Sequence, residues 1–165
     1  MADIIQSAWG IVYYISSDNE PRYLLIKRYA LSKKIERVAP KGKIQAGEES
    51  QVAALREVSE ETGIPINQMF IKQKIGKTEL RNPTNQKGMV NKDVTYFLIE
   101  YTGSPTTVKI QDAEGYLWMY KRATITEVLS LLYYQDMREL IRESYNIIKN
   151  MKTKDTVKEN FIKSL

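Results

Sequence analysis

Three glutamates near the middle of the chain have the spacing of a small carboxylate cluster. Glu57, Glu60 and Glu61 fall within residues 51–62, a stretch with helical periodicity. Residues three or four apart on a helix are neighbours, and like charges at that spacing destabilise the helix unless a cation lies among them. Carboxylate oxygens suit hard divalent cations, so these residue types point first to binding of Mg²⁺ or Mn²⁺.

The segment around these glutamates reads as a loop followed by a helix. Gly42 and Gly47 fall in the predicted loop, and Ser50 is the predicted N-cap. The helix is expected over residues 51–62, with Gly63 ending it as the C′ residue. At about 100° per residue, the glutamates fall on one side of this helix and an apolar face on the other. The predicted apolar face consists of Val52, Leu55 and Val58.

A single cation, Arg56, stands on this predicted helix. Arg56 can reach Glu60 at i+4, but one arginine does not neutralise three carboxylates. Three glutamates on a helix are more often an ordinary solvated surface. The spacing of the whole segment, G-x5-E-x7-R-E-V-x-E-E-x-G-I, argues against that reading. Its fixed positions are Gly42, Glu48, Arg56, Glu57, Glu60, Glu61 and Gly63, with aliphatic Val58 and Ile64.

This segment resembles the Nudix box, the signature of a family of hydrolases that act on nucleoside diphosphates linked to another group. The resemblance implies an α/β fold, the Nudix α/β/α sandwich, with a mixed β-sheet and the box as loop–helix–loop. It covers roughly residues 7–148. The order of predicted elements agrees, with strands at 7–16, 22–28, 68–80, 93–101, 106–111 and 116–120 and helices at 124–133 and 135–149. We expect one domain over residues 1–150 and a polar tail or helix extension over 151–165.

Composition excludes several kinds of chemistry. The 165-residue chain has no cysteine and no histidine, so thiol nucleophiles, disulfides, imidazole bases and histidine-ligated metals are ruled out. The formal net charge of +5 is compatible with a polyanionic substrate such as a nucleotide or RNA. No apolar run is long enough to cross a membrane, and the lack of cysteine fits a reducing compartment, so a cytoplasmic protein is predicted.

The resemblance also implies roles for individual residues. The box glutamates Glu57, Glu60 and Glu61 would bind Mg²⁺ or Mn²⁺, with the Gly42 carbonyl as a further ligand. Arg56 would orient a box glutamate, and a metal-held water would attack phosphorus. Lys41 and Lys43 flank the first box glycine, where a cation could meet substrate phosphate; a solvated loop lysine is the alternative for each.

Features outside the box are similar to those of the asymmetric diadenosine tetraphosphate hydrolases, which release ATP and AMP. They are Pro40-Lys41-Gly42, Thr95-Tyr96-Phe97-Leu98 and Glu114-Gly115-Tyr116-Leu117-Trp118. Such members use a carboxylate in the loop before the Tyr-x-Trp strand as metal ligand or base, and here Asp112 and Glu114 are both candidates. Tyr96 and Tyr116 are candidates for binding the substrate, Tyr96 by stacking on adenine, with a core aromatic as the alternative for both.

Three functions are therefore compared. The first is a metal-dependent hydrolase of diadenosine tetraphosphate. The second is a pyrophosphohydrolase acting on the 5′ end of RNA, which the basic charge and the polar segment at residues 81–92 would suit. The third is a non-catalytic nucleotide-binding module, which the complete set of box glutamates disfavours.

Overall fold

A mixed β-sheet with its central strand near the N-terminus organises the molecule. The computed structural model describes residues 3–29, 35–38, 40–81, 90–108 and 116–164; for residues 27–29, 35–38, 41, 107 and 116–122 the description is limited to the backbone. β1 (Ile4–Ile15) is parallel to β6 (Asn91–Tyr101) and antiparallel to β2 (Pro21–Tyr29). The strand order across the sheet is β3-β2-β1-β6-β5, with β3 at Ile35–Val38 and β5 at Met69–Leu80.

Two further strands join this sheet outside the main order. β4 (Lys41–Lys43) is antiparallel to the first half of β1, and β7 (Tyr116–Ala123) is antiparallel to β2. Short 3₁₀ turns at Ile66–Gln68 and Pro105–Thr107 connect other elements. The short β4 contains Gly42, the first residue of the box, and so places the start of the box against β1.

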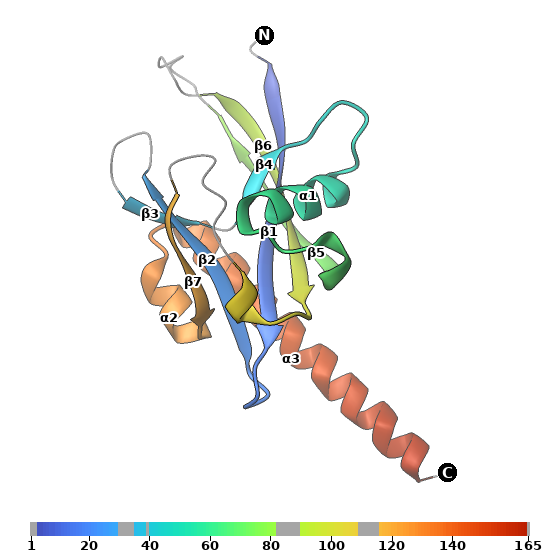
Figure 1. The fold of residues 1–165 in the computed structure, drawn as a ribbon. Coiled ribbons are helices and arrows are strands. Elements are labelled where there is room, and N and C mark those ends of the chain that lie inside the picture. Colours follow the sequence, from blue (N-terminus) through green and yellow to red (C-terminus); the bar gives the residue numbers. More distant parts are fainter. Residues whose placement is uncertain (1–2, 30–34, 39, 82–89, 109–115, 165) are drawn as a thin grey trace.

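Helices cover both faces of the sheet (Figure 1). α1 (Ser50–Thr62) lies on one face, and α2 (Ile125–Leu131) and α3 (Gln135–Lys163) lie on the other. We call these the α1 face and the α3 face. Side chains alternate between faces along each strand, so Ala8, Val12 and Phe97 pack under α1 while Ile11, Tyr13 and Leu98 pack under α2 and α3. The predicted α/β/α sandwich with a mixed sheet is confirmed.

α1 packs on the sheet through small residues. Ala53, Ala54 and Val58 are fully buried, and Gly10 of β1 lies beneath them. A methyl group added to Gly10 would come within 2.5 Å of Val58 Cγ2, so the glycine allows the helix to approach closely. The predicted apolar face is therefore wrong at Val52, which is 50% exposed. Helical periodicity correctly placed Val58 on the buried face, but it did not place Ala53 and Ala54 there.

Most predicted elements are confirmed, with corrections at their ends. The hairpin of the first two strands and the strands predicted at 93–101 and 116–120 are present. The N-cap of α1 is Glu49 rather than Ser50, and it makes no side-chain cap hydrogen bond, whereas Gly63 ends the helix in the left-handed conformation as predicted (φ 70°). The strand predicted at 106–111 is wrong at Thr106 and Thr107, which form a 3₁₀ turn; residues 109–111 lie outside the described residues.

The C-terminal helix is longer than predicted. Thr124 caps α2 through a capping box with Glu127, and α3 then runs to Lys163 instead of ending at residue 149. Its first half packs on the sheet, and its second half projects away from it (Figure 1). No helix in the described part of the chain is long and apolar enough to span a membrane.

Candidate active site

Gly42 and Glu57 bring the start of the box and its helix into contact. A Cβ atom built on Gly42 would lie 1.8 Å from the carboxyl carbon of Glu57, so no side chain fits between β4 and this carboxylate. Gly42 is not among the glycines with positive φ, and it lies in strand β4 rather than in the predicted loop. Glycine is required at position 42 because a side chain would overlap Glu57, not because of the backbone conformation. Gly47 is the reverse case, with φ of 76° and nothing within 4 Å of an added Cβ.

Arg56 connects the box through five hydrogen bonds. Its Nε and Nη2 donate to the two carboxylate oxygens of Glu48, at 2.8 and 3.0 Å. Its Nη1 donates to Glu57 at 2.7 Å and to Glu60 at 3.2 Å. Nη2 also donates to the main-chain carbonyl oxygen of Lys43 at 2.9 Å, which ties β4 to the helix. The predicted contact from Arg56 to Glu60 is present. The bidentate interaction of Arg56 with Glu48 is the stronger of the two.

The charges in this group stabilise one another. The Arg56 guanidinium, and secondarily the Gln45 backbone N–H, lower the pKa of the Glu48 carboxyl to about 2. The hydrogen bond to Glu48 in turn raises the pKa of Arg56 above its usual value, despite the opposing effect of burial. Glu48 and Arg56 therefore form a charged pair at neutral pH that fixes the loop against the helix.

The three box glutamates do not share one exposed face. Side-chain exposure is 15% for Glu57 and 58% for Glu60. Glu61 is only 4% exposed and lies among the residues of α1 that face the sheet. The prediction that all three lie opposite the apolar residues is therefore wrong for Glu61. Because the helix is rotated to bury Ala53, Ala54 and Val58, position 61 turns inward with them.

The carboxylate oxygens of Glu57 and Glu60 fit an open divalent-cation site. Oxygens of Glu57 and Glu60 both lie within 3.2 Å of one nitrogen of Arg56, so the two carboxylates already converge on a single cationic position. In the part of the chain that the structure describes, no group of three or more Asp, Glu, His or Cys side chains lies close enough together to hold a metal ion. Mg²⁺ commonly binds through one or two carboxylates and keeps several waters, so two convergent carboxylates suit it.

The predicted substrate residues fall at different places. Lys43 is exposed, and in β4 it lies opposite Ser7 of β1, while Lys41 lies opposite Trp9. Tyr96 is 3% exposed on the α3 face, where it contacts Trp9 edge to face at 5.2 Å between ring centroids and bonds Thr78 at 3.1 Å. These contacts match the core alternative for Tyr96 and leave its stacking on adenine a prediction. The side chains of Lys41 and Tyr116, and the whole of Asp112 and Glu114, lie outside the described residues.

Comparison with models of known protein families identifies the family of this chain. The model of the NUDIX domain matches residues 5–143, which includes every element described above apart from Ile4 at the start of β1 and residues 144–163 of α3. The chain belongs to the Nudix family. The similarity seen in the box is thus confirmed over most of the length of the protein.

Among characterised Nudix proteins, the chain is similar to bis(5′-nucleosyl)-tetraphosphatases of the asymmetrical type. The rat protein is 27% identical over 110 residues, covering 66% of this chain and 69% of the rat protein. The pig protein is 29% identical over 113 residues, covering 68% and 71%. The resemblance to asymmetric diadenosine tetraphosphate hydrolases is confirmed at this modest identity.

Solved Nudix structures share the fold. A C. elegans Ap4A hydrolase in a binary complex superposes with a TM-score of 0.73 at 20% identity, covering 89% of this chain and 99% of that chain. The NUDIX domain of Shewanella oneidensis NrtR, solved with ADP ribose, gives a TM-score of 0.67 at 14% identity, covering 90% of each chain. At these identities the likeness shows the architecture alone.

Two features of this Nudix protein were missed from the sequence. The pairing of Glu48 with Arg56 spans a loop and a helix, and helical periodicity carries no signal for a contact across eight residues. Tyr133 and Tyr134, which precede α3, form an edge-to-face pair with exposures of 88% and 51%. The predicted helix at 124–133 included Tyr133, whereas α2 ends at Leu131, so the exposed pair in the link to α3 was not predicted.

Proposed function

We propose that this Nudix protein is a divalent-metal-dependent hydrolase of dinucleoside tetraphosphates that splits diadenosine tetraphosphate into ATP and AMP. The observation that carries the proposal is the convergence of Glu57 and Glu60 on one cationic position beside Gly42. The relatives named as asymmetrical bis(5′-nucleosyl)-tetraphosphatases supply the substrate class and the expected point of cleavage.

Mg²⁺ or Mn²⁺ would be held by Glu57, Glu60 and Glu61, with the Gly42 carbonyl as a further ligand. When bound, such a cation lowers the pKa of water and offsets phosphate charge. Glu57 and Glu60, which both accept hydrogen bonds from Arg56, and the buried Glu61 would supply the carboxylate oxygens. Gly42 keeps the space in front of Glu57 open, since any side chain there would overlap the carboxylate.

Arg56 and Glu48 would position the site without touching substrate. Besides its bonds to Glu57 and Glu60, Arg56 donates two hydrogen bonds to Glu48 and one to the Lys43 carbonyl. Those bonds hold α1 and β4 at a fixed separation. Since most catalysis in phosphoryl transfer is positioning and electrostatics, this fixed geometry would contribute to turnover although no bond to the reacting atoms is made.

Four other residues and one alternative pair complete the proposed site. Lys41 and Lys43 would contact the phosphates, and Tyr96 and Tyr116 would contact the nucleoside. Asp112 or Glu114 would act as the additional carboxylate, and the two are distinguished by comparing kcat of Asp112→Asn and Glu114→Gln. We expect a large loss for one variant and a small loss for the other.

The substrate class is tested by comparing the two candidate substrates. Purified protein with Mg²⁺ is given diadenosine tetraphosphate and a 5′-triphosphorylated RNA in separate reactions, each with an EDTA control, and kcat/KM is compared. We expect a higher value for the dinucleotide, with no reaction in EDTA. A higher kcat/KM on RNA would reassign the protein to RNA 5′-end processing, and metal-independent or absent turnover of both would reject the proposal.

A further inference from the structure

An unpartnered hydroxyl is buried in the strand that pairs with the start of the box. Ser7 is 1% exposed, and within the described residues its Oγ has no hydrogen-bond partner. Buried hydroxyls are nearly always bonded, because leaving one unpaired costs the free energy of its lost hydration. The exceptions call for a reason, and a ligand that supplies the missing partner is one.

The surroundings of Ser7 are those of a binding site on a rigid support. β1 is paired on both sides at this position, with Lys43 of β4 on one side and Val94 of β6 on the other. Side chains alternate along β1, so Ser7 shares the α3 face with Trp9, whose indole contacts Tyr96. Solvent reaches the adjoining position, since Lys43 is exposed. Ser7 therefore lies opposite Lys43 across the strand pair and two residues along β1 from Trp9.

The same pair of strands carries the proposed metal site on its other face. Gly42 lies between Lys41 and Lys43, and its Cα faces the Glu57 carboxylate. In the described part of the chain, β4 pairs with β1 alone, so the other edge of β4 is not covered by a strand. A polyphosphate bound on the α1 face can therefore pass around this edge past Lys43. The group attached to it would arrive on the α3 face beside Ser7.

We propose that the Ser7 hydroxyl binds the nucleobase of the substrate and sets which base is preferred. This rests on the proposed function for the position of the phosphates. A nucleobase has the required chemistry, because it offers a flat face for Trp9 or Tyr96 and a polar edge for a hydroxyl. A binding site with a buried polar group discriminates strongly between ligands that form a hydrogen bond with that group and ligands that do not.

Ser7→Ala tests this with two readouts that move in opposite directions. Removing an unpaired hydroxyl from the free protein is expected to raise its Tm, while removing the partner of the base is expected to raise KM for diadenosine tetraphosphate about tenfold with kcat nearly unchanged. Ser7→Thr, which retains a hydroxyl, should restore much of the affinity. Ser17→Ala, at an exposed turn beyond the far end of β1, is the matched control.

A binding measurement separates this inference from the proposed function. AMP is titrated in EDTA while tryptophan fluorescence is followed, for the parent, Ser7→Ala and Ser17→Ala. Weaker AMP binding by Ser7→Ala alone supports the inference even if no dinucleotide is hydrolysed. Equal AMP affinity in all three proteins, or an unchanged KM with an unchanged preference between diadenosine and diguanosine tetraphosphate, would overturn it.

Discussion

At the scale of single residues, Gly42 and Gly47 are glycines for different physical reasons within one motif. Both are box-segment glycines, yet Gly42 is required because Glu57 fills the space where a side chain would be. Gly47 is in open space, and its positive φ of 76° is what favours glycine there. One glycine thus protects the geometry of a carboxylate, and the other allows a turn.

This difference predicts opposite outcomes for the same substitution. Gly42→Ala should displace the Glu57 carboxylate and lower kcat/KM by about 100-fold, since displacements of about 1 Å in a catalytic group can cost that much. Gly47→Ala should instead destabilise the protein by about 1 kcal/mol and leave kcat/KM close to that of the parent. Steady-state kinetics and urea unfolding of the two variants check this. Full activity in Gly42→Ala would show that Glu57 is free to move without consequence.

At the scale of elements, the ends of β5 and β6 are held by charge. The Asp93 carboxylate, with a side chain 10% exposed, forms ion pairs with Arg81 at 2.7 Å and with Lys77 at 3.2 Å. Gln6 of β1 donates to it at 3.2 Å. Arg81 is the main cause, followed by Gln6, of a pKa for Asp93 of about 2. Three strands are thus joined through one ionised carboxylate.

A pH dependence of stability follows from this lowered pKa. Because the folded-state pKa of Asp93 lies below its usual 3.8, its contribution is complete above about pH 4 and is lost as the pH falls toward 2. Asp93→Asn should therefore be less stable than the parent at pH 6, with the difference shrinking between pH 4 and pH 2. Urea midpoints over that range measure it.

The matched control for Asp93 lies in the same cluster. Glu79 also pairs with Arg81, but its side chain is 59% exposed, so Glu79→Gln should change stability little at any pH. A difference between Asp93→Asn and the parent that stays constant down to pH 2 would mean that ionisation of Asp93 does not hold the strands.

Part of this element-level organisation could be predicted and part could not. The longer strands β1, β2, β5, β6 and β7, the box helix and its Gly63 end follow from period, apolar pattern and turn residues, whereas the short strands β3 and β4 were not predicted. The face occupied by Glu61 could not be read from the sequence, because the small residues Ala53 and Ala54 set the packing only once Gly10 lies beneath them. The bonds from Arg56 to Glu48 and to Lys43 depend on how a loop folds back onto the helix, which local sequence does not encode.

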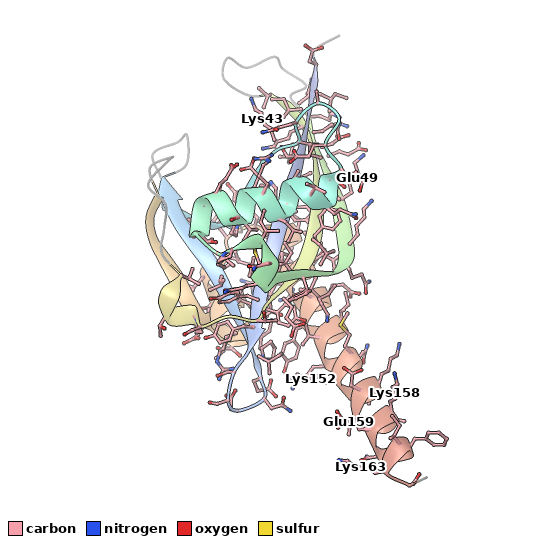
Figure 2. All side chains as sticks on the ribbon, turned by 45° about the vertical axis from the view of Figure 1, so that its right-hand side comes forward. Lys43, Glu49, Lys152, Lys158, Glu159 and Lys163 are labelled. Carbon is pink, nitrogen blue, oxygen red and sulfur yellow. The ribbon has the colours of Figure 1, made fainter. Side chains whose placement is uncertain are left out.

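At the scale of the whole molecule, α3 has two parts with different surroundings. Its first part is anchored to the β1–β2 turn, where Lys149 pairs with Glu20 and Lys152 bonds Asn19. From Thr153 onward every described residue is exposed. Figure 2 shows Lys158, Glu159 and Lys163 on this projecting part, far from Lys43 beside α1.

Removal of residues 153–165 is therefore predicted to leave the Nudix domain intact. The anchoring contacts of Lys149 and Lys152 remain, and the deleted segment buries little surface. We expect the free energy of unfolding to change by less than about 1 kcal/mol and kcat/KM by less than about twofold. Circular dichroism melting and steady-state kinetics of the truncated protein measure both. Unfolding or loss of activity on truncation would show that the projecting segment is part of the domain.

The most direct test of the account is cation binding to the box carboxylates without substrate. Free Mn²⁺ is followed by electron paramagnetic resonance during titration into the parent, Glu57→Gln and Glu60→Gln, with Glu159→Gln on the projecting part of α3 as control. We predict saturable binding by the parent and by Glu159→Gln, with Mn²⁺ affinity lowered at least about tenfold in the two box variants. Equal Mn²⁺ binding by all four proteins, or none by the parent, would contradict the assignment of Glu57 and Glu60 as metal ligands.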